Sequence, residues 1–280
     1  MAHQLHYYWH HDTKTKRIAR MKRTVLSICA LVASTSAAYA ANITPYYLTD
    51  GDSSLTYEIT NGVLTNTFTT DQLGYPLAVR DSIWLGNRDD GGATEFSLAG
   101  VSTGNTSAGG SNFKQLLDGA AGNSANYGVE CCGGTNSVTI ANVDWSNQRV
   151  LFDLGFNGTG VAYDFVSNSL FISEFGNTIY NYDLTGQLIQ SFNIGMRLVG
   201  LAYETATDTV WGFNRSTNNL VQLDKNGAIL QDVDIANFAP NNPFGGEMRV
   251  SSVPTVPEPA PLALLGLGLL GLGLARKRRG

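Results

Sequence analysis

The chain has 280 residues, of which 15% are charged and 31 are glycine. This length fits one large all-β domain or two small ones, and the glycine-rich composition favours short strands and tight turns over long helices. Residues 41–259 carry 8 basic and 22 acidic side chains, a net charge of −14. Because such a domain repels phosphate backbones, we do not expect it to bind nucleic acid.

The first predicted element is a secretory signal. Residues 21–23 (Met-Lys-Arg) begin a short basic region, residues 24–33 form an apolar run, and Ala38 and Ala40 form a small-residue cleavage site. We expect cleavage after Ala40. With the upstream extension before it, the signal makes up residues 1–40, and we expect its apolar run to form a helix.

All four histidines lie in the first eleven residues, so removal of the leader leaves a chain without histidine. This excludes Ser-His-Asp and Cys-His catalysis and histidine-bound zinc from the mature protein.

The mature region begins with three predicted strands, at 46–48, 55–59 and 63–68. Their spacing resembles strands two to four of a four-stranded unit that lacks its first strand. We expect residues 247–251 to supply that strand, because a unit shared between the two ends of the domain removes an exposed sheet edge.

Weaker copies of the same unit follow at about 78–98 and 113–156. Trp84 in the first of them takes the place that Trp211 has further along the chain. Because Trp84 and Trp211 stand at equivalent strand positions, we expect them to pack between units rather than to form a sugar-stacking platform.

The clearest copies begin with Gly-Val-Ala-Tyr at 160–163 and with Gly-Leu-Ala-Tyr at 200–203. Each continues through an apolar strand, an alternating strand that ends in Asp, and a turn containing Gly186 or Gly227. Asp183 and Asp224 recur in front of these turns, which favours a turn-capping role. Four strands in about forty residues is the period of a β-propeller blade.

The sequence therefore predicts an all-β propeller over residues 41–253, with five four-stranded blades and four or six as alternatives. The two clearest repeats loosely resemble NHL- and gluconolactonase-type propellers. That resemblance implies a fold and transfers no functional residue.

Cys131 and Cys132 are the cysteines that remain after the leader is removed. In an oxidising compartment we expect a disulfide between them, with free thiols or an intermolecular bridge as alternatives.

Two acidic loop clusters are weak candidates for calcium, the pair Asp50 and Asp52 and the pair Asp89 and Asp90. Oxygen-rich loops suit Ca²⁺, although solvated turn aspartates give the same pattern. No other cofactor is predicted.

The chain ends in Pro257-Glu258-Pro259, an uncharged apolar run over 260–275, and a basic cluster. The cluster that stops membrane transfer consists of Arg276, Lys277, Arg278 and Arg279. This order of parts, over residues 254–280, resembles the PEP-CTERM sorting domain. The resemblance implies a transmembrane helix held transiently in the inner membrane, recognition by an exosortase, and delivery to the cell surface or the exopolysaccharide matrix. An ordinary C-terminal anchor is the alternative.

Two functions stay open for the propeller. The first is a non-catalytic scaffold that binds polysaccharide or another envelope protein through its loops. The second is an enzyme that works with carboxylates alone, either a glycosidase or a metal-dependent lactonase-like protein. Glu174, Asn214 and Glu247 lie near predicted strand ends and are candidates for the second.

Overall fold

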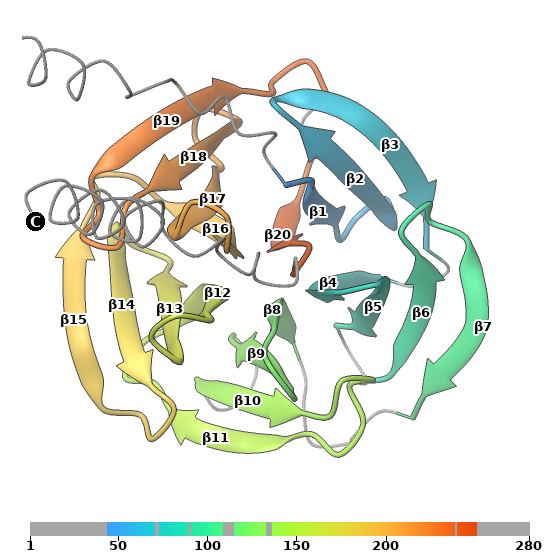
Figure 1. Cartoon of the computed structure of the whole chain (residues 1–280), viewed down its shortest axis with the longest axis horizontal. Helices are drawn as coiled ribbons and strands as arrows, with labels where there is room; N and C mark the ends of the chain where they lie inside the picture. Colours follow the sequence, from blue (N-terminus) through green and yellow to red (C-terminus); the bar gives the residue numbers. More distant parts are fainter. Residues whose placement is uncertain are drawn as a thin grey trace, which may run out of the picture. The chain divides into compact units, whose positions relative to one another are not determined.

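Each repeat of about forty residues folds into one blade, an antiparallel sheet of four strands that runs outward from a central axis (Figure 1). The computed structural model describes residues 44–70, 73–88, 91–108, 115–132, 136–238 and 240–250. These residues form five blades, which confirms the predicted all-β propeller. The signal segment and the apolar tail, both predicted to be helical, lie outside the described residues.

Within each blade the four strands follow one another from the axis outward. The first blade contains β20 (Pro243–Met248), β1 (Tyr46–Asp50), β2 (Leu55–Thr60) and β3 (Val63–Thr69). The second contains β4 (Gly74–Val79), β5 (Ser82–Asn87), β6 (Ala93–Ser97) and β7 (Ser102–Ser107). The third contains β8 (Leu116–Ala121), β9 (Asn126–Glu130), β10 (Ser137–Ala141) and β11 (Arg149–Asp153). The fourth contains β12 (Gly158–Asp164), β13 (Ser169–Glu174), β14 (Thr178–Asp183) and β15 (Leu188–Asn193). The fifth contains β16 (Leu198–Glu204), β17 (Thr209–Asn214), β18 (Asn219–Leu223) and β19 (Ile229–Asp234).

The ring closes through the first blade, as predicted, but with a different segment. The innermost strand β20 begins at Pro243 and ends at Met248, so only its last two residues fall within the predicted 247–251. Met248 pairs with Tyr46, and Gly246 pairs with Leu48. The prediction missed the start of β20 because Pro-Phe-Gly-Gly has neither alternation nor β-branched residues. The glycines are present because this strand approaches its neighbours closely at the axis.

Crowding at the axis explains the composition of the innermost strands. β4, β8, β12, β16 and β20 are buried along their whole length and are rich in glycine and alanine. The outermost strands are instead mostly exposed, and β3 alternates between exposed and covered positions. Small residues therefore recur where the five innermost strands converge at the axis.

Neighbouring blades are joined at their outer edges by a repeated contact. The turn glycines Gly186 and Gly227 have φ of 85° and 88° and lie against Phe152 and Phe192 of the preceding blade. A Cβ at either glycine would clash with the ring beneath it. The predicted turns are thus also the points at which one blade rests on the next.

The tryptophans pack inside the domain, as predicted. Trp145 and Trp211 are almost completely buried, and Trp84 packs against the cluster that contains Trp145. Trp84 and Trp211 occupy matching places, each opposite an alanine of the innermost strand, Ala78 or Ala202.

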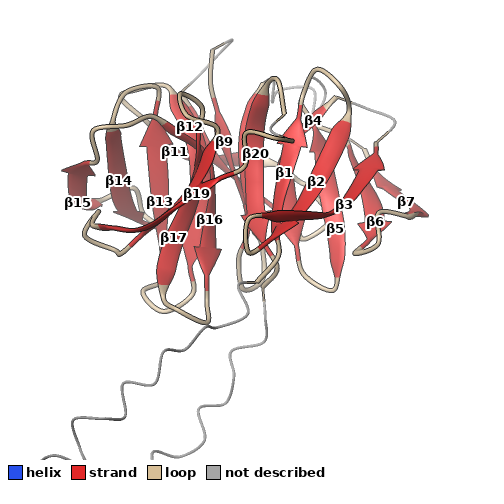
Figure 2. Cartoon of the chain, turned by 90° about the horizontal axis from the view of Figure 1, so that it is seen from above, coloured by secondary structure: helices blue, strands red, loops and turns tan. Residues whose placement is uncertain are grey.

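The strands run between two faces of the propeller (Figure 2). We call the face at which the innermost strands begin the top face and the face at which they end the bottom face. Tyr46, at the start of β1, pairs with Met248, at the end of β20, so both ends of the described propeller lie at the bottom face. Among the described residues no helix is long and apolar enough to cross a membrane.

Candidate binding face

A buried carboxylate occupies the axis. Asp118 of β8 has no exposed surface, and its Oδ2 accepts hydrogen bonds from the backbone N–H groups of Val161 (2.8 Å) and Leu201 (2.9 Å). Its Oδ1 accepts the N–H of Gly246 at 2.9 Å. One side chain therefore joins the innermost strands of four blades.

The donors for Asp118 come from irregular strand pairing. The innermost strand of every blade shows a register shift against its neighbour. Such bulges leave backbone N–H groups without a partner in the ladder, and a buried N–H needs one. Burial raises the pKa of Asp118 well above its usual value, and the N–H donors oppose that shift. Asp118 lies at the bulge of β8, where the fourth and fifth blades have the glycines Gly160 and Gly200.

A second buried carboxylate lies on β20. Glu247 Oε2 accepts the N–H of Ala121 at 2.8 Å, and its Oε1 accepts the N–H of Met248 at 2.9 Å. Burial raises its pKa, an effect that these N–H groups and the nearby charge of Arg80 oppose. Both axial carboxylates are therefore engaged by backbone groups inside the protein.

The structure does not bring the three enzyme candidates together. Glu174 and Asn214 end β13 and β17 at the top face, where they pair with the first residues of β12 and β16. Glu247 is buried near the bottom end of β20, opposite Tyr47. The sequence could not separate these positions, because it showed that each was near a strand end but not near which end.

Polar residues end the second strand of every blade and form a ring at the top face. The five are Asp50, Asn87, Glu130, Glu174 and Asn214. Several of them organise the loops. Asp50, for example, accepts the N–H groups of Asp52, Asn241 and Asn242.

The predicted calcium loops are only partly visible. Asp50 is buried and accepts three loop N–H groups, and Asp52 accepts the side-chain amide of Asn242 at 3.1 Å. In the described part of the chain no three His, Cys, Asp or Glu side chains are grouped as metal ligands. Asp89 and Asp90 lie outside the described residues, so calcium binding stays a prediction.

Arginines and aromatic rings gather on the top face, around the point where the axis of the propeller meets that face. We call this set the arginine–aromatic cluster; it consists of Tyr75, Arg88, Phe175, Arg197, Arg215 and Phe244. Phe244 is the hub, with ring centroids 5.2 Å from Tyr75 and 6.3 Å from Phe175. Each arginine lies over one ring: Arg88 over Tyr75 at 5.4 Å, Arg197 over Phe175 at 4.3 Å and Arg215 over Phe244 at 4.6 Å.

This cluster was not predicted from the sequence, because its members are scattered over 170 positions. What they share is that each member adjoins the top end of a first or second strand. Tyr75 and Phe244 are the second residues of β4 and β20, and Arg88, Phe175 and Arg215 directly follow β5, β13 and β17.

The adjacent cysteines lie at the same point of the top face. The sulfurs of Cys131 and Cys132 are at bonding distance, and Cys131 is buried in the core cluster that includes Leu117, Tyr75 and Phe244. Cys132 is exposed and has φ of 71°. The disulfide stays a prediction, which the geometry supports.

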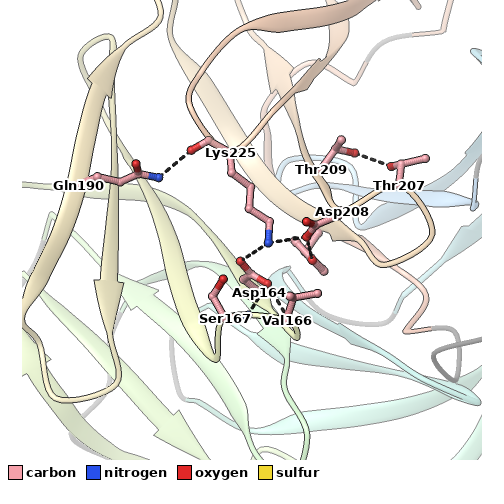
Figure 3. A network of polar contacts seen from close by, with 9 residues as sticks. Asp164, Val166, Ser167, Gln190, Thr207, Asp208, Thr209 and Lys225 are labelled. Atoms are coloured by element: carbon pink, nitrogen blue, oxygen red, sulfur yellow. Dashed lines mark hydrogen bonds and ion pairs between the residues drawn. The ribbon is translucent and has the colours of Figure 1, made fainter.

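The bottom face contains a tie between the fourth and fifth blades rather than an open cluster (Figure 3). Lys225 contacts Asp164 Oδ2 at 2.9 Å and also pairs with Asp208. Asp164 Oδ1 accepts the N–H groups of Val166 and Ser167. Burial alone would raise the pKa of Asp164, but Lys225 and these N–H groups outweigh it and leave the pKa lowered.

Comparison with known proteins identifies the C-terminal segment. Residues 255–279 match the PEP-CTERM protein-sorting motif, which contains Pro257, Glu258 and Pro259. The motif marks an exported protein that is processed by exosortase and sorted toward the cell surface. Residues 251–280 and the signal segment with Ala38 and Ala40 lie outside the described residues. Signal cleavage, the transmembrane helix and the membrane stop at 276–279 therefore stay predictions.

Comparison with solved structures supports the fold alone. A chain of a nidogen/laminin complex matches with a TM-score of 0.50 and 11% identity, over 73% of this chain and 97% of that chain. A protein of unknown function from Bacteroides caccae matches with a TM-score of 0.47 and 12% identity, over 70% and 74% of the two chains. A search of curated proteins finds no relative by sequence.

Proposed function

We propose that the propeller is a non-catalytic binding module that holds extracellular polysaccharide at the cell surface through its top face. The observation that carries the proposal is the placement of the chain ends. Both ends of the described propeller leave from the bottom face, so a sorted or tethered tail leaves the top face directed away from the attachment point.

The chemistry of the top face supports the same function. Phe175 is 36% exposed, and it stands beside half-buried arginines and the polar ends of the second strands. Sugars are bound by this mixture of an apolar ring surface and fixed polar groups. Another envelope protein is the alternative partner, but no surface feature of the described residues favours it specifically.

A carboxylate enzyme is the weaker candidate. A glycosidase needs two carboxyl groups that face the substrate at a set separation. The two axial carboxylates, Asp118 and Glu247, instead accept backbone N–H groups and have at most 3% of their surface exposed. Of the other partners, exosortase acts on the tail rather than on the propeller. Nucleic acid is not expected to bind, because the domain is strongly acidic and repels phosphate.

The test uses the full-length chain, purified in mild detergent, and the exopolysaccharide of its own host, with and without Ca²⁺. We expect the protein to bind the polymer without shortening it. Release of shorter saccharides would make the protein an enzyme, and absence of binding in both conditions would overturn the proposal.

A further inference from the structure

Two arginines of the arginine–aromatic cluster, Arg197 and Arg215, lie close to each other at the top face. Their guanidinium carbons stand 4.3 and 4.6 Å from the centroids of Phe175 and Phe244, and those two rings are themselves in edge contact. Burial lowers the pKa of Arg197, and the charge of Arg215 lowers it further. The positive charges of Arg197 and Arg215 are thus held near each other by their contacts with the Phe175 and Phe244 rings.

No carboxylate of the described residues forms an ion pair with either arginine. In the part of the chain that the structure describes, the ion pairs involve Lys225 and Arg249, and none involves Arg197 or Arg215. This is unexpected because residues 41–253 contain 21 acidic and only 8 basic side chains. Repulsion between adjacent cations costs free energy, which a bound anion would recover.

The hydrogen-bonding capacity of the two guanidinium groups is also largely unused. An arginine has five N–H donors, and among the described residues one of the ten is engaged, by the Oδ1 atom of Asn242 at 3.1 Å from Arg215 Nη2. The Nε atom of Arg197 is buried and has no partner. Donors fixed in this way match the two oxygens of a carboxylate, which arginine binds through paired hydrogen bonds.

We infer that the top face recognises an acidic polysaccharide, through contacts of Arg197 and Arg215 with the carboxylates of its uronic acid units and of the Phe175 ring with a sugar face. This inference rests on the proposed function and narrows it to a ligand class. The described acidic groups of the top face do not contradict it, because each accepts a hydrogen bond within the protein. Asp50 and Glu130 are buried, and they accept from loop N–H groups and from the Ser137 hydroxyl. Asp52 accepts from Asn242, and Glu174 accepts the Tyr180 hydroxyl at 3.4 Å. The domain's negative charge limits the site to short, specific contacts rather than general attraction of polyanions.

The test compares the full-length chain with R197Q, R215Q and R215K. The probes are oligogalacturonate, the same oligosaccharide after reduction of its carboxyl groups, and the reduced oligosaccharide after sulfation of its hydroxyl groups. R149Q is the matched control, because Arg149 is exposed at the start of β11 and its change removes the same charge. Thermal melting of each variant shows that the fold is intact.

We expect oligogalacturonate to bind, and each glutamine variant to weaken binding roughly ten- to a hundredfold, the range for one charged hydrogen-bonding group. R215K should keep part of the affinity, R149Q should bind as the unaltered chain does, and reduction of the carboxyl groups should abolish binding. Preference for the sulfated probe, or equal affinity of the reduced probe, would overturn the inference.

The outcome separates this inference from the proposed function. If the host polymer binds equally to the unaltered chain and to R197Q and R215Q, the proposed function stands and the acidic ligand is wrong. If oligogalacturonate binds through the arginines but the host polymer does not bind, the ligand class stands and the proposed cellular role is wrong. Binding of neither refutes both.

Discussion

Replacement of Asp118 should weaken the whole propeller, because its carboxylate joins four blades. In D118A the N–H groups of Val161, Leu201 and Gly246 lose their acceptor at once. An unsatisfied buried N–H costs roughly 1–3 kcal/mol. Water that enters the new cavity and the removal of a buried carboxylate offset part of this sum. We therefore expect the free energy of unfolding to fall by about 3–5 kcal/mol.

D118N provides a graded test of the same contact. The amide keeps one oxygen, which can accept from Val161 and Leu201, but its NH₂ group then faces the N–H of Gly246. We expect this variant to lose about 1–3 kcal/mol, the cost of one unsatisfied donor.

Urea unfolding of the full-length chain, followed by tryptophan fluorescence, measures both losses. D153A is the matched control, because Asp153 is exposed on the outer strand of the same blade as Asp118. The reasoning is refuted if D118A and D153A unfold at the same urea concentration, or if D118N is less stable than D118A.

Three further outcomes follow from contacts at other places in the fold. G227A should lower the free energy of unfolding by about 1–3 kcal/mol, because Gly227 has positive φ and lies on Phe192. Gly104 also has positive φ but has open space around it, so G104A should cost only the backbone strain of a non-glycine residue at positive φ. Equal losses in urea unfolding would show that the contact with Phe192 contributes nothing. Asp164 has a lowered pKa in the folded state, so it stabilises the fold above about pH 4 and that stability is lost as the pH falls through the folded pKa. D164N should therefore be less stable than the unaltered chain at pH 7 by about 1–3 kcal/mol and should lose less stability between pH 5 and pH 3. D81N, at the fully exposed Asp81, should behave as the unaltered chain does. Finally, alkylation of the exported, denatured chain without reductant should leave Cys131 and Cys132 unmodified and should label both after reduction; labelling before reduction would show free thiols.

The fold was predictable where side chains alternate. The fourth and fifth blades have regular apolar strands and turn glycines such as Gly186, so their forty-residue period is visible in the sequence. The strand β7 was not predicted, because Ser-Thr-Gly-Asn-Thr-Ser is polar and mostly exposed. β8 was only loosely placed, because Leu-Leu-Asp-Gly-Ala-Ala follows the crowding at the axis rather than an alternating pattern.

The site was less predictable than the fold, because its contacts are distant in sequence. Asp118 accepts from residues 43, 83 and 128 positions away, which no local pattern shows. A comparison of the repeats would have marked it, since an acid stands where Gly160 and Gly200 are found. Arg197 and Arg215 had no such marker, because each is a single arginine beside a strand end.

The central claim is that the top face, rather than the bottom face, binds polysaccharide. Binding of the host exopolysaccharide by S216E and A206E tests it most directly. Ser216 is exposed beside Arg215 on the top face, Ala206 is exposed in the β16–β17 loop of the bottom face, and each change adds one negative charge. We expect S216E to lose most of the binding and A206E to keep it. Equal binding by the two variants, or loss in A206E alone, would contradict the account.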